Sequence, residues 1–321
     1  MQDSPILAHP LKLLSPSSGH TFRSCPRKFE LSRIGKYTLT TEQRESAATG
    51  YGSAFGAGLA TLMSGKGINQ AILQAIVNYR FNEIYPTAYK EEKSLFYCIN
   101  ALKRFNETEM AGITDEWEIL TINGEPATEV NFAIRLPYGF YYRGFIDLVM
   151  QHKETKLILA IEVKTDGAYP SLNPEVTEAK YKNAEQGTAY SLVADYLADQ
   201  LGVSNDIAIC YIVHYTKNNT FKPMIFPKPP ATRVRFLEDL MANVDMQNYL
   251  VERNKPYPLT GNCSQFSRVC DYYGICHVDK FDFPTMDYIS IGEGFTRIIE
   301  LDYLVNLQHQ RLSQVFNEIG N

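Results

Sequence analysis

The sequence lacks a long hydrophobic run. None of its 321 residues belongs to an uninterrupted apolar stretch of about 18 or more, the length that a membrane-spanning helix requires. The first residues, Met-Gln-Asp-Ser-Pro-Ile-Leu, also lack the basic and then apolar order of a secretion signal. We therefore expect a cytoplasmic protein that has no membrane partner.

An excess of positive charge is also missing. Lys and Arg number 31 and Asp and Glu number 36, which gives a net charge of -5. Proteins that bind nucleic acids gain much of their affinity from basic side chains that release counterions. Local basic clusters would have to supply that contact here. Arg23, Arg27 and Lys28 form one such cluster, in a segment predicted to be helical from Ser15 toward Ile34. A solvated basic helix is the alternative interpretation.

A phosphate-binding glycine loop is excluded as well. The segment from Ala47 to Gly67 contains six glycines among Ala, Leu and Phe, but it lacks the lysine and hydroxyl spacing that such loops need. Small residues let helices approach closely, so we expect a packed helix here.

Cysteines are few, and their spacing indicates two kinds. Cys98 and Cys210 lie in apolar contexts and are predicted to be core residues. Cys263, Cys270 and Cys276 lie in a polar loop with the spacing Cys-x6-Cys-x5-Cys. In a reducing compartment, cysteines more often bind metals than form disulfides. The spacing differs from the Cys-x2-Cys signature of zinc sites, and the alternatives are a zinc site or unrelated thiols.

Two apolar segments around a polar turn predict a β-hairpin from Gly144 to Lys164. Side chains alternate along a strand, so Glu162 and Lys164 point to the same face. Charges on an apolar strand are costly unless they are paired or bound to a metal. Glu162 and Lys164, together with Asp147 on the first arm, therefore indicate a divalent-metal site. A Glu-x-Lys pair alone would more commonly mark a solvated strand edge.

Three motifs in combination resemble RecB-type nucleases of the PD-(D/E)XK superfamily. They are Gly-Phe-Ile-Asp at 144–147, Glu-Val-Lys at 162–164 and Gln-Gly-Thr-Ala-Tyr at 186–190. The glutamine and tyrosine of the third motif share one helix face. The resemblance implies an α/β fold: a restriction-endonuclease-like αβββαβ core with a mixed central sheet, and N- and C-terminal helical extensions joined at an iron-sulfur cluster.

The order of predicted elements agrees with that core. Strands are predicted at Trp117 to Ile122, Val130 to Ile134, Ile207 to Tyr215 and Thr220 to Phe226, and helices at Val176 to Leu201, Arg233 to Asn254 and Arg297 to Phe316. We expect one integrated domain in three consecutive regions. These are an N-terminal helical region (1–115), a nuclease core (116–226) and a C-terminal helical region (227–321).

The resemblance also implies roles for the motif residues. Asp147 and Glu162, with the backbone carbonyl of Val163, would hold Mg²⁺ or Mn²⁺. Lys164 would act on the attacking water or the phosphate, and Gln186 and Tyr190 would steady the strand being cut. One feature departs from the family, because relatives place a metal-binding histidine on the glycine-rich helix and no histidine lies between residues 51 and 63.

A further segment, Ser-Cys-Pro-Arg-Lys-Phe at 24–29, resembles the N-terminal cysteine segment of the RecB-type nucleases that contain an iron-sulfur cluster. This resemblance implies that Cys25 joins Cys263, Cys270 and Cys276 in binding a [4Fe-4S] cluster.

The implied function is that of a Mg²⁺- or Mn²⁺-dependent deoxyribonuclease, an exonuclease rather than an endonuclease, that acts on DNA ends or single strands. Such proteins serve phage recombination, repair or CRISPR adaptation and work with other proteins of those systems, in the cytoplasm of a bacterial host if phage-encoded. The alternative is a catalytically weak DNA-binding or adaptor protein that an iron-sulfur cluster or zinc stabilises.

Overall fold

The computed structural model describes residues 7–34, 47–79, 91–167, 174–203, 206–253, 255–261, 263–265, 268–270, 272–277, 289–290 and 297–320. The chain forms two compact units, and neither is continuous in sequence. Unit 1 comprises Met1–Gln43, Asn131–Gly144 and Val234–Gln310, and unit 2 comprises Arg44–Val130, Phe145–Arg233 and Arg311–Asn321. The three consecutive regions expected from the sequence stay a prediction.

Unit 2 contains a sheet and most of the helices. Its elements are α3 (Ala47–Thr61), η2 (Leu62–Lys66), α4 (Gly67–Asn78), η4 (Glu91–Lys93), α5 (Leu95–Thr108), α6 (Met110–Glu116), β3 (Trp117–Ile119), β4 (Thr121–Ile122), β5 (Glu125–Pro126), β8 (Ile158–Asp166), α7 (Pro174–Lys182), α8 (Glu185–Leu201), β9 (Ile207–Tyr215) and β10 (Thr220–Pro227). Strands β6 (Thr128–Arg135) and β7 (Tyr141–His152) contribute residues to both units.

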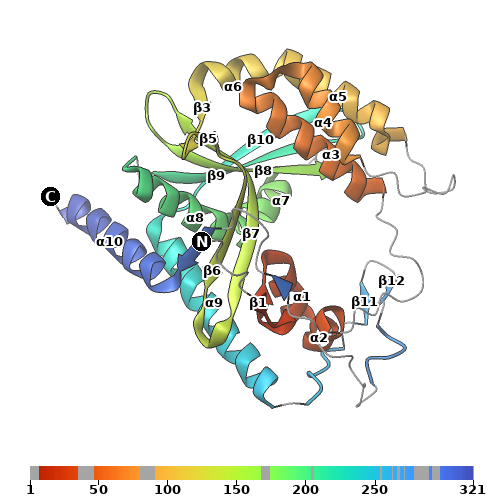
Figure 1. Cartoon of the computed structure of the whole chain (residues 1–321), viewed down its shortest axis with the longest axis vertical. Helices are drawn as coiled ribbons and strands as arrows, with labels where there is room; N and C mark the ends of the chain where they lie inside the picture. Colours follow the sequence, from red (N-terminus) through yellow and green to blue (C-terminus); the bar gives the residue numbers. More distant parts are fainter. Residues whose placement is uncertain are drawn as a thin grey trace. The chain divides into compact units, whose positions relative to one another are not determined.

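The sheet of unit 2 is mixed, as predicted. Strand β8 pairs with β7 in antiparallel fashion and with β9 in parallel, and β10 is antiparallel to β9. The hairpin is therefore confirmed, in a register that runs from Leu148 opposite Ile161 to Gln151 opposite Ile158. Helices α3 to α6 cover one face of these strands and α8 covers the other (Figure 1). The predicted α/β class follows from this arrangement.

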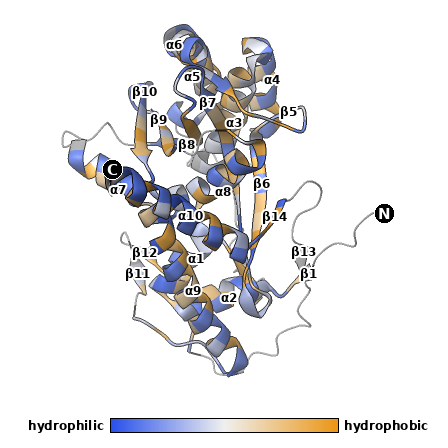
Figure 2. Ribbon diagram, turned by 90° about the vertical axis from the view of Figure 1, so that its left-hand side faces the viewer, coloured by the Kyte–Doolittle hydropathy of each residue, from blue (hydrophilic) through white to orange (hydrophobic). Residues whose placement is uncertain are grey.

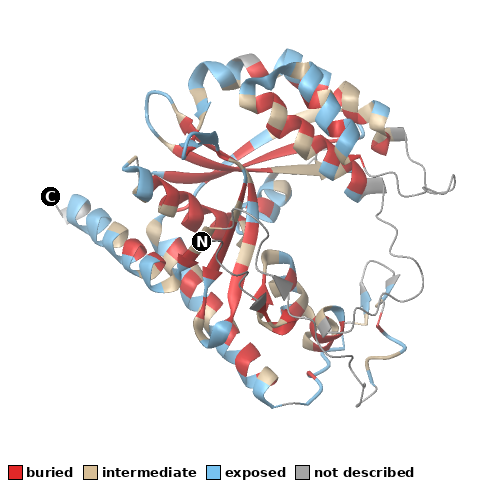
Figure 3. Cartoon of the chain, viewed as in Figure 1, coloured by how far each residue is buried: buried red, intermediate tan, exposed pale blue. Residues whose placement is uncertain are grey.

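Burial explains why these segments are strands. All nine residues of β9 are buried, so a helix lies over each face of that strand. On the face toward α3 and α5, Leu148, Ile161 and Cys210 join one core with Cys98. Both cysteines are buried, as their apolar contexts predict. Figure 2 shows hydrophobic residues on β9 and β10 and many hydrophilic residues on α6 and α10. Figure 3 shows that β7 and α8 are largely buried.

Two helices differ from the prediction. The segment predicted as one helix from Val176 to Leu201 forms two, α7 and α8, because Ala184 has an extended backbone. The predicted helix from Arg297 begins instead with a short strand, β14 (Arg297–Glu300), which pairs in parallel with β6. The helix α10 (Leu301–Gly320) follows. No described helix is long and apolar enough to span a membrane.

Unit 1 combines short helices, short strands and loops. Its other elements are β1 (Leu7–Ala8), η1 (Pro10–Lys12), β2 (Leu13–Leu14), α1 (Pro16–Ser24), α2 (Pro26–Ile34), η5 (Pro137–Gly139), most of α9 (Pro230–Glu252), β11 (Ser264–Gln265), β12 (Arg268–Val269), β13 (Ile289–Ser290), β14 and the first half of α10. In this unit β2 pairs in parallel with the first residues of β7.

The predicted helix from Ser15 toward Ile34 is also divided. Ser15 caps α1 through a capping box with Ser18, as its sequence predicts. The helix then ends at Cys25, whose backbone is extended, and α2 starts at Pro26. A residue before proline avoids the helical region, and proline favours the first helical position. The Cys-Pro pair therefore removes Cys25 from both helices.

Gly187 allows α8 to lie against the sheet. A Cβ atom at this position would be 2.6 Å from the hydroxyl oxygen of Tyr211 and 3.3 Å from a methyl carbon of Ile209, both on β9. A contact this close requires the helix, the strand or the buried Tyr211 side chain to shift. The glycine between Gln186 and Thr188 therefore sets how closely the start of α8 approaches β9.

A buried histidine fastens α3 to the same sheet. His214 of β9 is fully buried and stacks on Phe55 and Tyr51 of α3. Its two ring nitrogens lie 3.2 Å from the hydroxyl oxygen of Tyr51 and 3.0 Å from Oδ1 of Asn219. Burial, which outweighs the hydrogen bond to Asn219, lowers the pKa of His214 to about 4.

We predict that Gly187→Ala lowers the free energy of unfolding by about 1–3 kcal/mol, because the added methyl group overpacks the α8–β9 contact. The matched control is Gly112→Ala on α6, where a Cβ atom would meet nothing within 4 Å. That change should be neutral or stabilising by up to about 1 kcal/mol, since alanine favours a helix over glycine. Urea denaturation measures both, and equal effects would contradict the proposed close contact.

We also predict that His214 makes stability fall in acid. The unfolded chain takes up a proton near the ordinary pKa of 6.5, whereas the folded chain resists protonation until about 4. The free energy of unfolding should therefore decrease as the pH falls from 6.5 to 4, by up to about 1.4 kcal/mol per pH unit from this group. His214→Phe should show a shallower pH dependence than the wild type or than His20→Gln, a change at an exposed histidine of α1. Parallel curves would contradict this assignment.

Candidate active site

The strands β7 and β8 separate at Asp147. Their described pairing ends with Leu148 opposite Ile161. Beyond that pair, Oδ2 of Asp147, one residue from Leu148, accepts a hydrogen bond of 2.7 Å from the backbone N–H of Val163, two residues from Ile161. A side-chain carboxylate thus replaces a backbone carbonyl as the acceptor. The acid occupies the fork between the strands and is held there by the strand that contains Glu162.

Glu162, Lys164, Gln186 and Tyr190 form one hydrogen-bonded group. The ammonium of Lys164 donates to Oε1 of Glu162 and, over 3.1 Å, to Oε1 of Gln186. The amide nitrogen of Gln186 lies 2.9 Å from Oε1 of Glu162 and 2.8 Å from the hydroxyl oxygen of Tyr190. The three motifs predicted from the sequence therefore meet in one place, with Asp147 beside them in the fork. The catalytic roles of these five residues stay a prediction.

The two carboxyl groups are costly to ionise together. Burial is the main reason that the pKa of Asp147 is raised, although the N–H of Val163 and the charge of Lys164 oppose it. Burial and then the charge of Asp147 raise the pKa of Glu162, against the favourable charge of Lys164. Burial also raises the pKa of Tyr190, so its hydroxyl stays protonated. Two desolvated acids side by side favour a bound cation, which would remove the repulsion between them.

A polar cavity of about 470 Å³ opens at this fork. Asp147, Glu162 and Val163 line it from the sheet, and Thr128 and Glu129 line it from β6. The opposite wall is the glycine-rich helix, whose members here are Gly52, Ser53, Gly56, Ala57, Ala60 and Thr61. Ser64, Lys66, Gln74 and Asn78 complete the lining. A polar cavity with acids on one wall and small and polar residues on the other suits a hydrated ion and a substrate backbone.

The donors fit a hard divalent cation in part. Glu162 is only 6% exposed, and its Oε2 is buried. This oxygen has no hydrogen-bond partner among the residues that the structure describes. A buried carboxylate oxygen without a partner is unfavourable unless a ligand completes it. A Cβ atom at Gly56 would meet nothing within 4 Å, so the helix leaves open the space that a ligand side chain could fill. Within the described part of the chain, no three His, Cys, Asp or Glu side chains are grouped closely enough to hold a metal ion.

Glu129 also lines this cavity, and the sequence did not indicate it as a site residue. Glu129 is exposed, but partial desolvation of its carboxyl and then the charge of Asp147 raise its pKa. Glu129 precedes Val130, the residue from which that strand was predicted to begin, and no motif includes it. Its distinguishing feature is a backbone φ of 49°, which a sequence does not reveal.

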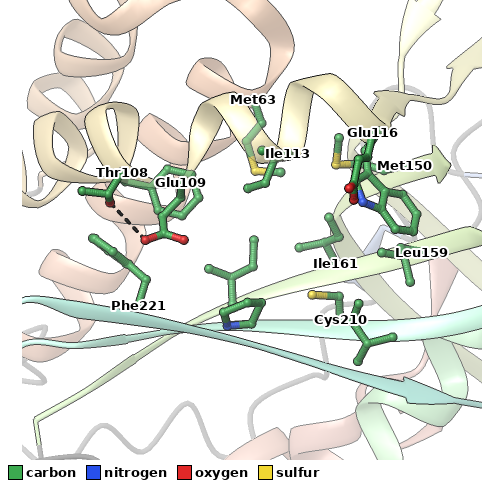
Figure 4. A pocket seen from close by; sticks show the side chains of 16 residues that line it. Met63, Thr108, Glu109, Ile113, Glu116, Met150, Leu159, Ile161, Cys210 and Phe221 are labelled. Carbon is green, nitrogen blue, oxygen red and sulfur yellow. Dashed lines mark hydrogen bonds between the residues drawn. The ribbon is translucent and has the colours of Figure 1, made fainter. Parts of the chain in front are cut away.

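A second cavity, of about 360 Å³, is mainly apolar and lies between the sheet and the helices α5 and α6, on the face that α3 also covers. Figure 4 shows Ile161, Leu159 and Cys210 on its sheet side, with Glu109 and Glu116 toward its two ends. Because neighbouring residues alternate, Ile161 points away from the face that Glu162 occupies. Glu162 is directed instead toward α8, where it accepts a hydrogen bond from Gln186.

The predicted cysteine site lies in unit 1, where hydrogen bonds hold its parts together. The guanidinium of Arg27 donates from Nε to the carbonyl of Cys276 over 3.1 Å and pairs with Glu30. Glu30 in turn accepts from the backbone N–H of Tyr257 over 2.9 Å. The hydroxyl of Thr260 donates to the carbonyl of Ser24 over 2.6 Å. The segment around Cys25 is therefore fastened to the loop that contains the other three cysteines.

The four thiols influence one another electrostatically. Burial and then the charges of Cys263, Cys270 and Cys25 raise the pKa of Cys276. Burial opposes ionisation of Cys25, but hydrogen bonds from Lys28, Thr260 and Arg27 outweigh it and lower the pKa of that thiol. All four are free and partly exposed. They do not form a metal-binding group in the described residues, so the predicted cluster is not shown.

One residue of the predicted DNA-binding cluster needs correction. Arg27 is 1% exposed, and its guanidinium is used within the protein by Glu30 and Cys276. A phosphate group cannot reach it, so Arg27 is a structural residue. Arg23 is exposed and Lys28 is partly exposed, and their contact with DNA stays a prediction.

The comparisons with known proteins agree with the motifs. Residues 13–277 match the PD-(D/E)XK nuclease superfamily. None of the curated proteins is significantly similar in sequence. Among solved structures, a "Putative exonuclease" from Eubacterium rectale has a TM-score of 0.47 at 10% identity, over 79% of this chain and 86% of that one. The protein SSO0001 has a TM-score of 0.24 at 14% identity, over 67% and 84%. Neither score is high enough to establish a common fold. The family match spans most of the chain and includes all three motifs, and the chain therefore belongs to the PD-(D/E)XK nuclease superfamily.

Proposed function

We propose that this protein is a metal-dependent deoxyribonuclease that hydrolyses phosphodiester bonds. The observation that supports this most is the hydrogen-bonded group of Glu162, Lys164, Gln186 and Tyr190 beside Asp147, at the edge of a polar cavity. A structural salt bridge would leave no buried acceptor oxygen unpaired, whereas Oε2 of Glu162 has no partner among the described groups.

The acids would hold Mg²⁺ or Mn²⁺ through Asp147, Glu162 and the backbone carbonyl of Val163. Such an ion, when bound, lowers the pKa of a coordinated water and neutralises charge that develops on the phosphate. Lys164 donates to Oε1 of Glu162 and would stabilise the negative charge of the transition state. Gln186 fixes the position of the lysine ammonium, and Tyr190 fixes the amide of Gln186.

An exposed aromatic side chain favours a single-stranded substrate. Phe145 is 51% exposed and lies two residues before Asp147, so both side chains leave β7 on the same side. Stacking of a base on an aromatic ring contributes roughly 1–3 kcal/mol and requires a base free of its duplex partner. We therefore infer that the enzyme acts on single strands or frayed ends, as an exonuclease.

The biological setting follows from the RecB-type motifs alone. On that resemblance we infer a role in phage recombination, repair or CRISPR adaptation, with DNA as the macromolecular partner. No base-reading module is recognisable in the protein sequence. This favours contacts with the DNA backbone that do not depend on the base sequence.

We predict that Asp147→Ala abolishes cleavage and that Lys164→Ala lowers turnover by about 10²–10³-fold, a typical cost of removing one group that stabilises transition-state charge. Lys164→Arg should rescue poorly, since a guanidinium spreads its charge over a larger plane.

The control is Lys103→Ala at an exposed position of α5. The assay follows end-labelled and circular DNA, single- and double-stranded, with Mg²⁺ or Mn²⁺. Wild-type rates in Asp147→Ala would overturn the function, and binding without cleavage by the wild type would indicate an adaptor protein.

We further propose that Cys25, Cys263, Cys270 and Cys276 bind a [4Fe-4S] cluster. Supporting features are the mutual electrostatic influence of the thiols, the lowered pKa of Cys25 and the hydrogen bonds that tie both cysteine segments through Arg27. The site chemistry suits thiolate ligation, and thiolates are the ligands of such clusters. The cluster would fasten α1 and α2 to the loop after α9.

We predict that protein purified without oxygen is brown and contains about four irons per chain. Replacing any one of the four cysteines by Ser should remove the visible absorbance and lower the melting temperature. Cys98→Ala and Cys210→Ala serve as controls, because both thiols belong to the core of unit 2, and neither should lose colour. Colourless protein with stoichiometric zinc would favour the zinc alternative, and protein with neither metal would leave four unrelated thiols.

A further inference from the structure

Glu129 has a backbone conformation that its position in a strand does not explain. Five described residues other than glycine have a positive φ. Asn123, Lys156 and Asn219 lie in turns and Tyr138 lies in the short helix η5, whereas Glu129 is the second residue of the strand β6 and has a φ of 49°. Left-handed backbone is unfavourable for a residue that has a Cβ atom. Such strain is commonly retained where the side chain it directs has a function.

The side chain directed in this way lines the polar cavity. Glu129 and Thr128 contribute to the wall that adjoins Asp147 and Glu162, and the charge of Asp147 acts on Glu129. Repulsion between neighbouring acids opposes this placement, as the strained backbone also does. A bound cation would offset both. The unpaired and buried Oε2 of Glu162 independently indicates a ligand in the same cavity.

The distance from the other acids determines which role Glu129 can have. No three acidic side chains are grouped tightly enough among the described residues to hold one ion directly, so Glu129 lies outside the innermost ligand set. Mg²⁺ usually keeps several waters and takes only one or two carboxylates. The helix α3 adds no carboxylate or imidazole on its side, where its cavity wall consists of Gly, Ala, Ser and Thr residues.

Charge supports the same conclusion. Asp147 and Glu162 are offset by two ammonium groups, that of Lys164 and that of Lys66, which also lines the cavity. The formal charge of these four groups is 0, and Glu129 brings it to −1. Glu129 therefore supplies the excess of negative charge that favours a cation in this cavity.

We propose that Glu129 is a positioning residue that holds the water ligands of the divalent cation bound by Asp147 and Glu162. This inference rests on the proposed function, because it assumes the metal site of that function. Glu129 accepts hydrogen bonds from those waters and adds a carboxylate to a cavity in which α3 provides none. Carboxylates that act through bound ligands in this way typically change metal affinity by about 10–100-fold.

The test measures Mn²⁺ binding to the full chain by calorimetry, without DNA. Glu129→Gln should weaken Mn²⁺ binding by about 10-fold or more, while Glu118→Gln, at an exposed position of β3, should leave it unchanged. Glu129→Gly separates function from stability. Glycine tolerates a positive φ, so this variant should keep or raise the melting temperature and still bind Mn²⁺ weakly.

Asp147→Asn distinguishes this proposal from the proposed function. If Asp147→Asn abolishes Mn²⁺ binding and Glu129→Gln binds as the wild type does, the role of Glu129 is overturned and the nuclease assignment stands. If Asp147→Asn also binds as the wild type does, the metal site itself is wrong and both conclusions fail. A loss of melting temperature in Glu129→Gly with unchanged Mn²⁺ affinity would show that Glu129 serves the fold alone.

Discussion

The hydrogen bond from the N–H of Val163 to the carboxylate of Asp147 is the contact on which the site depends. It ends the regular pairing of β7 and β8 and keeps the strands apart. If a backbone carbonyl accepted this N–H, the ladder would continue and close the fork. The cavity would then lose its sheet wall, and Glu162 would lie in an ordinary sheet beside a strand without an acid. A single side-chain acceptor thus creates the opening and supplies one of its acids.

The second level of organisation is the packing of helices on either side of this fork. Gly187 lets the start of α8 approach β9, so that Gln186 reaches Glu162 and Lys164. On the other face, His214 fastens α3 to β9 through aromatic stacking. The two helices therefore take their positions from the same buried strand, and an alteration of β9 would disturb both walls of the site.

Much of the fold and site could be predicted from the sequence, for identifiable reasons. Alternation and turn residues gave the hairpin of β7 and β8, and motif spacing brought Asp147, Glu162 and Gln186 together. The breaks at Cys25 and Ala184 were missed, because apolar spacing continues across them while the backbone does not. Arg27 has the charge of a phosphate ligand, but only the fold shows that Glu30 uses it. Glu129 was missed because a backbone angle distinguishes it from other glutamates.

The parallel pairing of β8 with β9 has a consequence for synthesis of the chain. A nascent chain that ends at Leu201 contains Glu129, Asp147, Glu162, Lys164, Gln186 and Tyr190, that is, every residue given a role in hydrolysis. Its strand β8 would nevertheless lack the partner that pairs with Ile158 through Asp166. The surface that supports Gly187 would also be absent. We therefore expect these side chains to come together only after β9 has left the ribosome.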